Sequence, residues 1–566
     1  MAEEKRQETA QERRRKHEAR FVALKAERAS WDAHWRQLAE NFRPRGSRFL
    51  TTEKNRGERR NVHIHNGTPL KSLRTLVAGM YAFITPPERK WFSVTVVDSE
   101  LAELTEVKQH CEEVETLVAA QLARSNFYRV APVMFGDLSC FGTHVTILEA
   151  DDEDGMRGYP CPVGSYCLAN DRRNKPATLY RQLRMTVEQL VEEFGLEACS
   201  VPARRQYEDG RFDAEVEVHH CITRNHDYEE GAVGTRGMRF VSLWWEAAAS
   251  QDVAFLRESG FRTQPFIAAR WDSTGEDVYG SSPAMEALGD AEKLQAAEWE
   301  KEQQLQLLRT PPMQGPASLA AKVVGLLPGD FTAVPDMVAG AKVTPAVEYD
   351  PRTLQAIMAD IAQKEARIEG MLYVDLWVAL QARDKQMTAR EVGAIEDEKF
   401  TQLSVVNAGL SDEGLDVVVN RTIDILAARG ELPQPPQALL EAGETGYKLE
   451  YISPFALAQK MQGTTGLQRL MAVVGQAAQL VPEVLDKLDV DQTVDEFARA
   501  LGVTPKVVRG DDEVQALRQR RAEAQQAAQQ VEEAQQAAKT AKTLAETPTQ
   551  GETALRALLR TTGAKP

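Results

Sequence analysis

Two stretches with helical patterns, residues 283–309 and 350–371, enclose an insertion rich in Pro and Gly, and this arrangement constrains the fold more than any other feature. The first stretch starts at Ser282-Pro283, and its middle, QAAEWEKEQQ, is too polar to lie wholly inside a core. Asp350 is placed to cap the second stretch, with Pro351 in its first turn. We therefore expect two helices that pack side by side and carry small strands and turns at 310–349.

The chain before these helices mixes helical and strand patterns. A helix is expected from Thr68 to about Ile84, with Pro69 in the first helical position, followed by a strand at 91–97 and a helix through 104–117. From 143 to 271 the pattern changes to short strands separated by Gly, Asp and Asn turns.

One short helix is expected within this strand-rich region. Thr186 and Gln189 have the spacing of a capping box, and Gly195 follows the last periodic residue. The acidic run from Asp151 to Asp154, before Gly155, indicates a hairpin tip rather than a calcium loop.

Near the N-terminus, apolar residues recur at helical spacing, with Arg28 in the one vacant position. These residues are Phe21, Leu24, Trp31, Trp35, Leu38 and Phe42. They predict an amphipathic helix that ends before Pro44 and needs a partner surface, which one subunit alone is not expected to cover. Trp31 and Trp35 are expected to be buried against the rest of the chain or a neighbour, with anchoring of a tail adaptor as the alternative. The following segment, RPRGSRFLTTEKNRGERR, predicts an exposed basic arm.

Beyond residue 371 the helical patterns resume. Thr388 and Glu391 form a capping-box pattern for a helix to about Leu410, and another helix is expected after Ser411, ending at Gly430. Further helical segments are expected at 453–502. The last fifty residues, rich in Ala, Gln and Glu, indicate a solvated helix or a thin coiled-coil seam through Leu517, Ala524, Val531 and Ala538.

Composition limits the classes of function. Residues 1–60 carry 17 Lys and Arg against 10 Asp and Glu, although the whole chain has a net charge of −16. An acidic chain is expected to bind nucleic acid weakly, because Lys and Arg side chains that neutralise phosphates supply most of the non-specific affinity. A net negative charge would nevertheless suit a channel through which DNA slides. The apolar runs are shorter than the roughly 20 residues that span a bilayer, so no membrane association is expected. Six cysteines in 566 residues predict a reduced chain without disulfides.

Enzymatic motifs are absent from the sequence. No G-x-x-x-x-G-K-[ST], G-x-S-x-G or H-E-x-x-H pattern occurs, so a separate ATPase would have to act as any motor. The pattern around Cys161, Cys167 and His219-His220-Cys221 favours ordinary packing over zinc, because neighbouring strand residues point to opposite faces. His63 and His65 lack a nearby acidic partner in the sequence. We expect no catalytic residue, metal or cofactor.

Several segments, in order, resemble the head-to-tail connecting (portal) proteins of podovirus-type bacteriophages, and the resemblance covers most of residues 15–440. Its carriers are SWDAHWRQLAENFRPRGSRF, LRTLVAGMYAFITPPERKWF, TLYRQLRMTVEQLVEEFG, PFIAARWDSTGEDVYGSSPAMEALGDAEKLQ, RTPPMQGP with LLPGD, MLYVDLW and MTAREV. The resemblance implies a ring, typically of twelve subunits, at one vertex of the capsid in the virion, made in the host bacterial cytoplasm. Double-stranded DNA would pass through it, and its partners would be the terminase large subunit, a tail adaptor, and the major capsid and scaffolding proteins.

The implied fold is α+β and mainly helical, with an α/β wing, a two-helix stem, a small β-containing clip and a helical crown. The corresponding segments are an N-terminal helix and basic arm at 1–60, the wing at 61–282, stem helices at 283–309 and 350–371, the clip at 310–349, a tunnel loop at 372–387, inner wing helices at 388–449, the crown at 450–510 and a helical or disordered tail at 511–566. The alternatives are a non-portal adaptor ring of the virion and, more remotely, a DNA-processing enzyme.

The resemblance also supplies candidate site residues. Arg383 and Lys385 lie on the segment that the family places at the narrowest part of the channel, and Asp384 stands between them. In a ring they would form a belt that contacts successive phosphates weakly; the alternative is that both residues form ion pairs on a solvated loop. The candidates for docking terminase and the tail in the clip are Pro311, Pro312, Gly315, Pro328 and Gly329.

Overall fold

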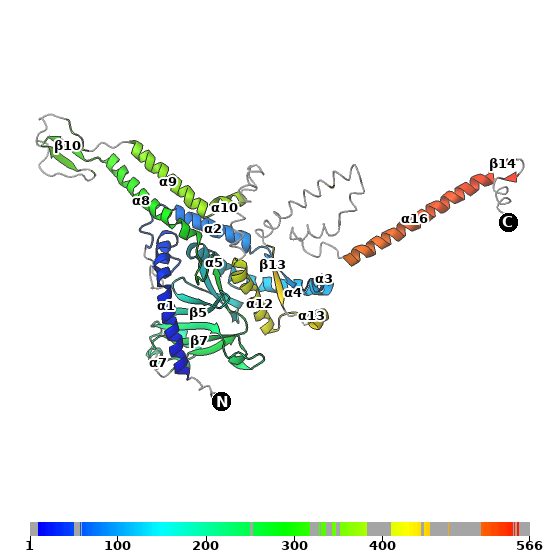
Figure 1. The fold of residues 1–566 in the computed structure, drawn as a ribbon, viewed down its shortest axis with the longest axis horizontal. Coiled ribbons are helices and arrows are strands. Elements are labelled where there is room, and N and C mark those ends of the chain that lie inside the picture. Colours follow the sequence, from blue (N-terminus) through cyan, green and yellow to red (C-terminus); the bar gives the residue numbers. More distant parts are fainter. Residues whose placement is uncertain are drawn as a thin grey trace. The chain divides into compact units, whose positions relative to one another are not determined.

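The computed structural model divides the chain into two compact units, Met1–Gln459 and Lys460–Pro566. The structure describes residues 9–49, 57, 59–248, 253–316, 328, 330–334, 342–346, 351–381, 409–442, 446–452, 474, 511–546, 548–549 and 552–553. The first unit combines helices with four sheets, as the expected α+β class requires (Figure 1).

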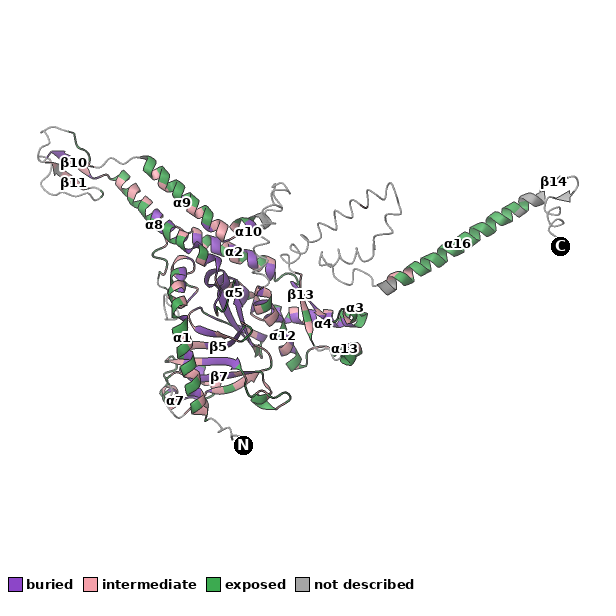
Figure 2. Ribbon diagram, in the orientation of Figure 1, coloured by how far each residue is buried: buried purple, intermediate pink, exposed green. Residues whose placement is uncertain are grey.

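Helix α1 (Ala10–Asn41) opens the first unit and begins earlier than its apolar stripe suggested. Thr9 and Glu12 form a capping box at its start, because each side chain accepts a hydrogen bond from the other residue's backbone N–H. The side facing the rest of the chain is buried, and the opposite side is exposed (Figure 2).

The apolar stripe of α1 is covered within the subunit, so the expectation that one subunit cannot cover it was wrong. Trp35, Leu38 and Phe42 are buried in the main core. Phe21 joins a smaller cluster with Tyr180 and Trp245 on the five-stranded sheet. The sequence pattern could not show that this partner surface is part of the same chain.

Arg28 occupies the vacant position of the stripe without breaking the burial. Its guanidinium pairs with Asp32 one turn later and donates to the backbone carbonyls of Gly164 and Tyr166. A buried guanidinium is tolerated where its charge is paired and most of its donors are used, as both terminal nitrogens are here, although Nε makes no hydrogen bond. The cation therefore fastens α1 to the start of strand β4.

The five-stranded sheet is antiparallel throughout, in the order β4-β5-β6-β7-β8. Its strands are β4 (Tyr166–Asn170), β5 (Pro176–Thr186), β6 (Glu215–Arg224), β7 (Phe240–Glu246) and β8 (Arg257–Phe261). Helix α6 (Val187–Phe194) begins at the predicted Thr186–Gln189 capping box and ends at Gly195, whose φ is +82°, so both of its predicted boundaries are confirmed. A second short helix, α7 (Val201–Glu208), was not expected; Ser200 caps it through a hydrogen bond from the N–H of Ala203.

A three-stranded sheet, β3-β2-β9, lies at the centre of the core. It consists of β2 (Thr143–Asp151), β3 (Gly155–Cys161) and β9 (Phe266–Arg270). The predicted hairpin tip is confirmed, because Asp151 accepts hydrogen bonds from the N–H groups of Glu153 and Asp154, and Gly155 takes a φ of +79°.

The helices of this part of the chain pack on the central sheet or on one another. They are α2 (Thr68–Ile84), α3 (Ser99–Glu103), α4 (Thr105–Arg124), α5 (Phe127–Phe141), α12 (Asp416–Arg429) and α13 (Gln437–Ala442). Helix α5 was not expected, and eleven of its fifteen residues are buried. Helix α12 ends at Gly430 as predicted, with a left-handed φ of +69° at that residue.

A two-stranded sheet joins distant parts of the chain. Strand β1 (Phe92–Val96) alternates between buried and half-buried residues, as the sequence predicted. Its antiparallel partner is β13 (Tyr447–Tyr451), in a register that pairs Phe92 with Tyr451. The expected boundary between residues 449 and 450 falls inside this strand.

The described part of the second unit is mainly a helix, α16 (Asp511–Glu546), followed by short strands β14 (Pro548–Thr549) and β15 (Glu552–Thr553). The described residues 511–546 of this predicted helical or disordered tail are helical. Its side chains are exposed along most of its length (Figure 2), and Val531 in the predicted seam is 57% exposed. The predicted helical segments at 453–502 lie outside the described residues.

Candidate functional site

Helices α8 (Pro283–Arg309) and α9 (Pro351–Met371) run side by side, as the sequence predicted (Figure 1). Ser282 caps α8 by accepting a hydrogen bond from the N–H of Met285. The first half of α8 is packed into the core through Ala287, Ala291 and Leu294. No residue of α8 after Ala297 is buried, so its polar second half is largely in contact with solvent.

Asn66 ties the two helices together at the point where α8 leaves the core. Its side-chain amide donates one hydrogen bond to Glu298 of α8 and another to Glu365 of α9, each at 2.9 Å. The Oε1 atom of Gln295 accepts the N–H of Asn66 at 2.9 Å, and the Gln295 amide donates to the Asn66 carbonyl at 3.0 Å. Both helices are therefore held by one residue that the sequence did not single out.

The start of α2 differs from the expectation, and the difference adds another hydrogen bond between this segment and α9. Gly67 is the cap residue of α2, and Thr68 is the first helical residue rather than the cap. The Thr68 hydroxyl donates instead to Glu365 at 3.1 Å, while the N–H of Thr68 donates to the side chain of Asn66. The sequence around Thr68 and Pro69 correctly indicated the start of a helix. The Thr68 hydroxyl does not cap that helix, because it binds the Glu365 carboxylate instead.

The far end of the pair carries a three-stranded sheet in the order β11-β10-β12. Its strands are β10 (Met313–Pro316), β11 (Phe331–Val334) and β12 (Thr344–Pro345), and β10 pairs in parallel with β11. This confirms small strands in the insertion.

The structure brings three of the five candidate residues of the insertion to β10. Pro311 and Pro312 lead into the strand, and the carbonyl of Pro312 accepts the N–H of Ala346 at 2.7 Å. Gly315 lies in β10, where a β-carbon would come within 2.9 Å of the Phe331 ring, so glycine is needed for this close approach. Pro328 lies in an exposed turn, and Gly329 lies outside the described residues.

The described part of the segment after α9, residues 372–381, is a turn followed by a helix. The remainder of the predicted tunnel loop at 372–387 lies outside the described residues, so the tunnel loop stays a prediction. Leu372 and Tyr373 form a turn, and α10 (Val374–Gln381) follows. Tyr373 has a φ of +56°, a left-handed value that is rare for a bulky residue and that redirects the chain. The buried side chains of Leu376 and Trp377 hold α10 against α2. Arg383 and Lys385 lie outside the described residues.

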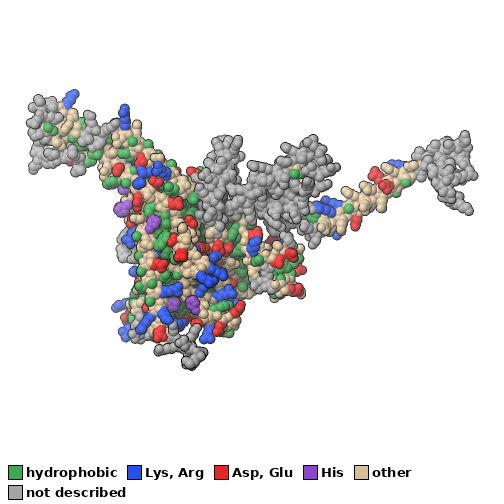
Figure 3. All heavy atoms as spheres, in the orientation of Figure 1, with side chains coloured by type: hydrophobic (Ala, Val, Ile, Leu, Met, Phe, Trp, Pro, Cys, Tyr) green, Lys and Arg blue, Asp and Glu red, His purple; other side chains and the backbone are tan. Residues whose placement is uncertain are grey.

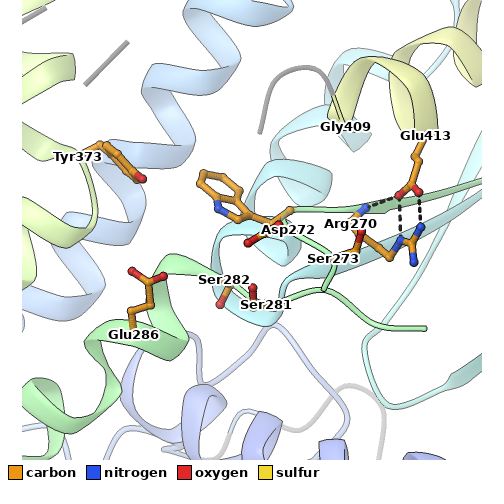
Figure 4. Close-up of a pocket in the computed structure, with 10 residues that line it drawn as sticks. Arg270, Asp272, Ser273, Ser281, Ser282, Glu286, Tyr373, Gly409 and Glu413 are labelled. Atoms are coloured by element: carbon orange, nitrogen blue, oxygen red, sulfur yellow. Dashed lines mark hydrogen bonds and ion pairs between the residues drawn. The ribbon is translucent and has the colours of Figure 1, made fainter. Parts of the chain in front are cut away.

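A pocket of about 370 Å³ lies beside this bend (Figure 4). Tyr373 and Glu286 line one side of it, and the rings of Tyr373 and Trp271 are 6.5 Å apart. Burial, and secondarily the negative charge of Glu286, raise the pKa of the Tyr373 hydroxyl. Both effects favour the protonated form of the Tyr373 phenol, which lies beside the Glu286 side chain in this pocket.

An ion pair between Arg270 and Glu413 closes the other side of the pocket (Figure 4). The Arg270 guanidinium contacts both carboxylate oxygens and also donates to the carbonyls of Asn174 and Asp277. The side chains of Arg270 and Glu413 are only 4% and 13% exposed. All polar groups of the pair that the structure describes are thus used for anchoring.

Glu413 belongs to a π-helical turn, η5 (Ser411–Leu415), that continues directly into α12. The sequence predicted that one helix ends at about Leu410 and that a new helix begins after Ser411. In the structure residues 409 and 410 are helical and run into the π-helical turn, so the chain does not leave the helix at this point. Turns of this kind occur where a side chain must leave the regular helical spacing. Here the turn places Asp412 on Lys175 and Glu413 on Arg270.

The comparisons with known proteins decide between the alternatives. Residues 14–508 match the family of bacteriophage head to tail connecting proteins. The chain belongs to this family. The connector match extends beyond the 15–440 that the sequence segments suggested and includes the region expected to form the crown.

Two relatives share nearly the full length of this connector chain. The portal protein of Salmonella phage epsilon15 is 40% identical over 547 residues, which cover 96% of this chain and 97% of that protein. The probable portal protein of Bordetella phage BPP-1 is 34% identical over 543 residues, again covering 96% and 97%. Connector and portal proteins are structural components of virions, so the relatives place this chain among structural proteins rather than enzymes.

The remaining sequence candidates of the connector chain have ordinary structural roles. His220 lies on the opposite face of β6 from His219 and binds Arg181 and Ser242, while His219 packs against Phe21 and Trp245. The ring of His65 packs against Trp299. All six cysteines are buried and free. In the described parts of the chain, no group of three or more His, Cys, Asp or Glu side chains is arranged to hold a metal, and no helix there is long and apolar enough to cross a bilayer.

Proposed function

We propose that this connector subunit is the portal of a short-tailed phage and assembles into a ring, typically of twelve copies, at one vertex of the capsid. Double-stranded DNA passes through the ring during packaging by a separate terminase and again at ejection. The observation that carries the proposal is the near full-length similarity to two phage portal proteins. The major capsid and scaffolding proteins would surround the ring in the virion.

The α8–α9 pair serves as the stem of this ring. A helix whose second half is polar and uncovered is suited to face neighbouring subunits on one side and a water-filled channel on another. Acidic and basic side chains are intermixed over the described residues of the face drawn in Figure 3, and the chain as a whole is acidic. Such a surface would add little phosphate affinity, so DNA could slide with low friction.

The insertion at 310–349 serves as the clip, which docks terminase and then the tail adaptor. The short strands around Gly315 support this role, because they form a compact head at the end of two long helices. The segment around Arg383 and Lys385 would contribute the weak contact with DNA inside the channel. Residues 450–510 would form the crown.

Electron microscopy of the purified protein tests the assignment. We expect closed rings with a central channel near the width of duplex DNA. A stable monomer of 63.0 kDa that cleaves DNA in the presence of metal would overturn it.

A deletion tests the clip separately. Removing residues 312–345 and joining the stem helices by a short linker should leave rings that neither package DNA nor attach tails. Normal packaging by this deletion would reject the clip assignment without rejecting the ring.

A further inference from the structure

Trp299 is the outlying tryptophan of this chain. All eight tryptophans lie among the described residues; Trp299 is 52% exposed, and each of the other seven is buried or partly buried. It stands on the uncovered half of α8, where its one aromatic neighbour is the ring of His65, with centroids 5.2 Å apart. An exposed indole is a frequent anchor of protein interfaces, because it combines a large apolar area with few rotatable bonds.

The outward side of α9 carries several small side chains beside the exposed Met358. Ile361 and Ile368 are buried on the side that faces α8, whereas four alanines are exposed away from it. These alanines are Ala356, Ala359, Ala362 and Ala366. A helix surface made of alanine lets another side chain reach close to the backbone, as between closely packed helices.

Trp299 and this alanine surface lie at the same level of the stem. Glu298 and Glu365 are both bound by the Asn66 amide, so the turn of α8 that carries Trp299 lies level with residues 362–366 of α9. A rotation about a ring axis roughly along the stem keeps this level. The Trp299 of one subunit would therefore meet Ala362 and Ala366 of the next subunit.

The charge of α8 limits which helix it can meet in another copy. Exposed charged residues of α8 are mostly acidic: Glu286, Glu292, Glu300 and Glu302 against Lys293 and Arg309. Helix α9 carries three Lys or Arg against three Asp or Glu, and its Arg367 lies 3.8 Å from Asp290 of α8 in the same subunit. The acidic surface of α8 disfavours contact of α8 with α8 of another copy, whereas the charge-balanced α9 presents no such repulsion.

We propose that Trp299 of each subunit packs on the Ala359–Ala366 surface of α9 in the adjacent subunit, so that the stem interface is head-to-tail and its occupant is a second copy of this chain. The proposal rests on the proposed ring. Two different surfaces meet, so the contact repeats around the ring and closes with it.

Cysteine pairs test the contact directly. The double variant Trp299→Cys with Ala362→Cys, treated with a short bismaleimide, should give a ladder of covalent multiples in denaturing gels. A mixture of chains that carry only one of the two substitutions should stop at dimers, and each single variant alone should remain monomeric. The native cysteines are all buried and do not compete. Trp299→Cys with Ala29→Cys, an exposed alanine of α1, is the matched control that should give no ladder.

The outcomes separate this contact from the ring itself. Rings that are visible by electron microscopy, but give no ladder from the double variant, would overturn the Trp299 contact and leave the ring standing. Dimers from Trp299→Cys alone would overturn the head-to-tail arrangement. As a second measurement, Trp299→Ala should raise the subunit dissociation constant about tenfold or more, as expected for a tryptophan anchor. Unchanged dissociation would also overturn the proposal, whereas an absence of rings in the unmodified protein would reject the proposed function instead.

Discussion

The indole ring of Trp377 lies directly against the backbone of Gly79, so closely that a β-carbon at Gly79 would overlap the ring. Gly79 is buried in α2 and Trp377 is buried in α10, so this contact fixes the position of α10. The chain from α10 leads on toward Arg383 and Lys385. Glycine at residue 79 is therefore required by packing and not by its backbone conformation.

Gly79→Ala should lower the free energy of unfolding by about 1–3 kcal/mol, because an added methyl group in a filled core forces neighbouring side chains to shift. Gly289→Ala is the matched control, since a β-carbon at this helical glycine of α8 meets nothing within 4 Å. The control should raise stability by about 0.5–1 kcal/mol through its better helix propensity. Denaturant titrations of both variants check the difference, and equal effects would contradict the packing argument.

Two neighbouring acidic residues of the π-helical turn should differ in their contribution to stability. Glu413→Gln should cost about 3–5 kcal/mol, because it leaves the buried Arg270 guanidinium without its counter-charge. Asp412→Asn should cost at most about 1 kcal/mol, since its pair with Lys175 is more than half exposed on both sides. Thermal unfolding of the two variants under the same conditions measures the contrast. Similar losses would show that the Arg270 pair is not desolvated.

Asn66→Asp should loosen the α8–α9 pair. The change keeps the shape of the side chain but replaces the amide that donates to Glu298 and Glu365 with a third carboxylate. We expect a loss of about 1–3 kcal/mol from the unmade hydrogen bonds, with added repulsion. Gln303→Glu adds the same charge at an exposed position of α8 and should have little effect. A variant Asn66→Asp that unfolds like the wild type would remove this bridge from the account of the stem.

Acid should weaken the attachment of α1 through His17. Burial lowers the pKa of His17 to about 4 from the ordinary 6.5, and its Nδ1 contacts the Tyr180 hydroxyl at 2.8 Å. Between pH 6.5 and about 4 the unfolded chain binds a proton at this residue and the folded chain does not, so stability falls as the pH falls through this window. His17→Gln should have a shallower pH dependence in this window, whereas His226→Gln, in an exposed turn, should follow the wild type. Parallel curves for wild type and His17→Gln would contradict the prediction.

The double change of Arg383 and Lys385 to Ala should leave rings intact and impair DNA packaging or retention. Surface changes seldom alter stability by more than about 0.5 kcal/mol, so a functional loss would come from the channel. Removing Arg172 and Arg173, two exposed cations in the turn between β4 and β5, is the matched control for loss of charge. Ring assembly, packaged length and leakage of DNA should be measured separately. Unchanged packaging and retention would exclude these two residues while the ring assignment stands.

The sequence predicted best where the structure is determined by neighbouring residues. The helix from Thr68 to Ile84, the capping box at Thr186 and the end of α12 at Gly430 all depend on residues within one or two turns. Helix α5 was not predicted, because it is buried on nearly all sides and so lacks a periodic pattern of apolar residues. It also contains Pro132, which argues against a helix.

Residues that connect distant segments were not predicted for a different reason. Asn66 acquires its role from Glu298 and Glu365, and Arg28 from the carbonyls of Gly164 and Tyr166, all of which are distant in the sequence. The residue with left-handed backbone conformation at this bend is Tyr373 itself and not a glycine, so the sequence did not indicate the bend. Tertiary contacts outweigh local preference at each of these positions, and one sequence contains no signal for them.

The pairing of β1 with β13 sets the order of events on the ribosome. Phe92 leaves the ribosome long before Tyr451, because the residues of the strand-rich region, both stem helices and the insertion are made between them. Synthesis proceeds at roughly 5–20 residues per second, so β13 follows β1 after an interval on the order of tens of seconds. During that interval the edge of β1 that later pairs with β13 can pair instead with other nascent chains from the same message.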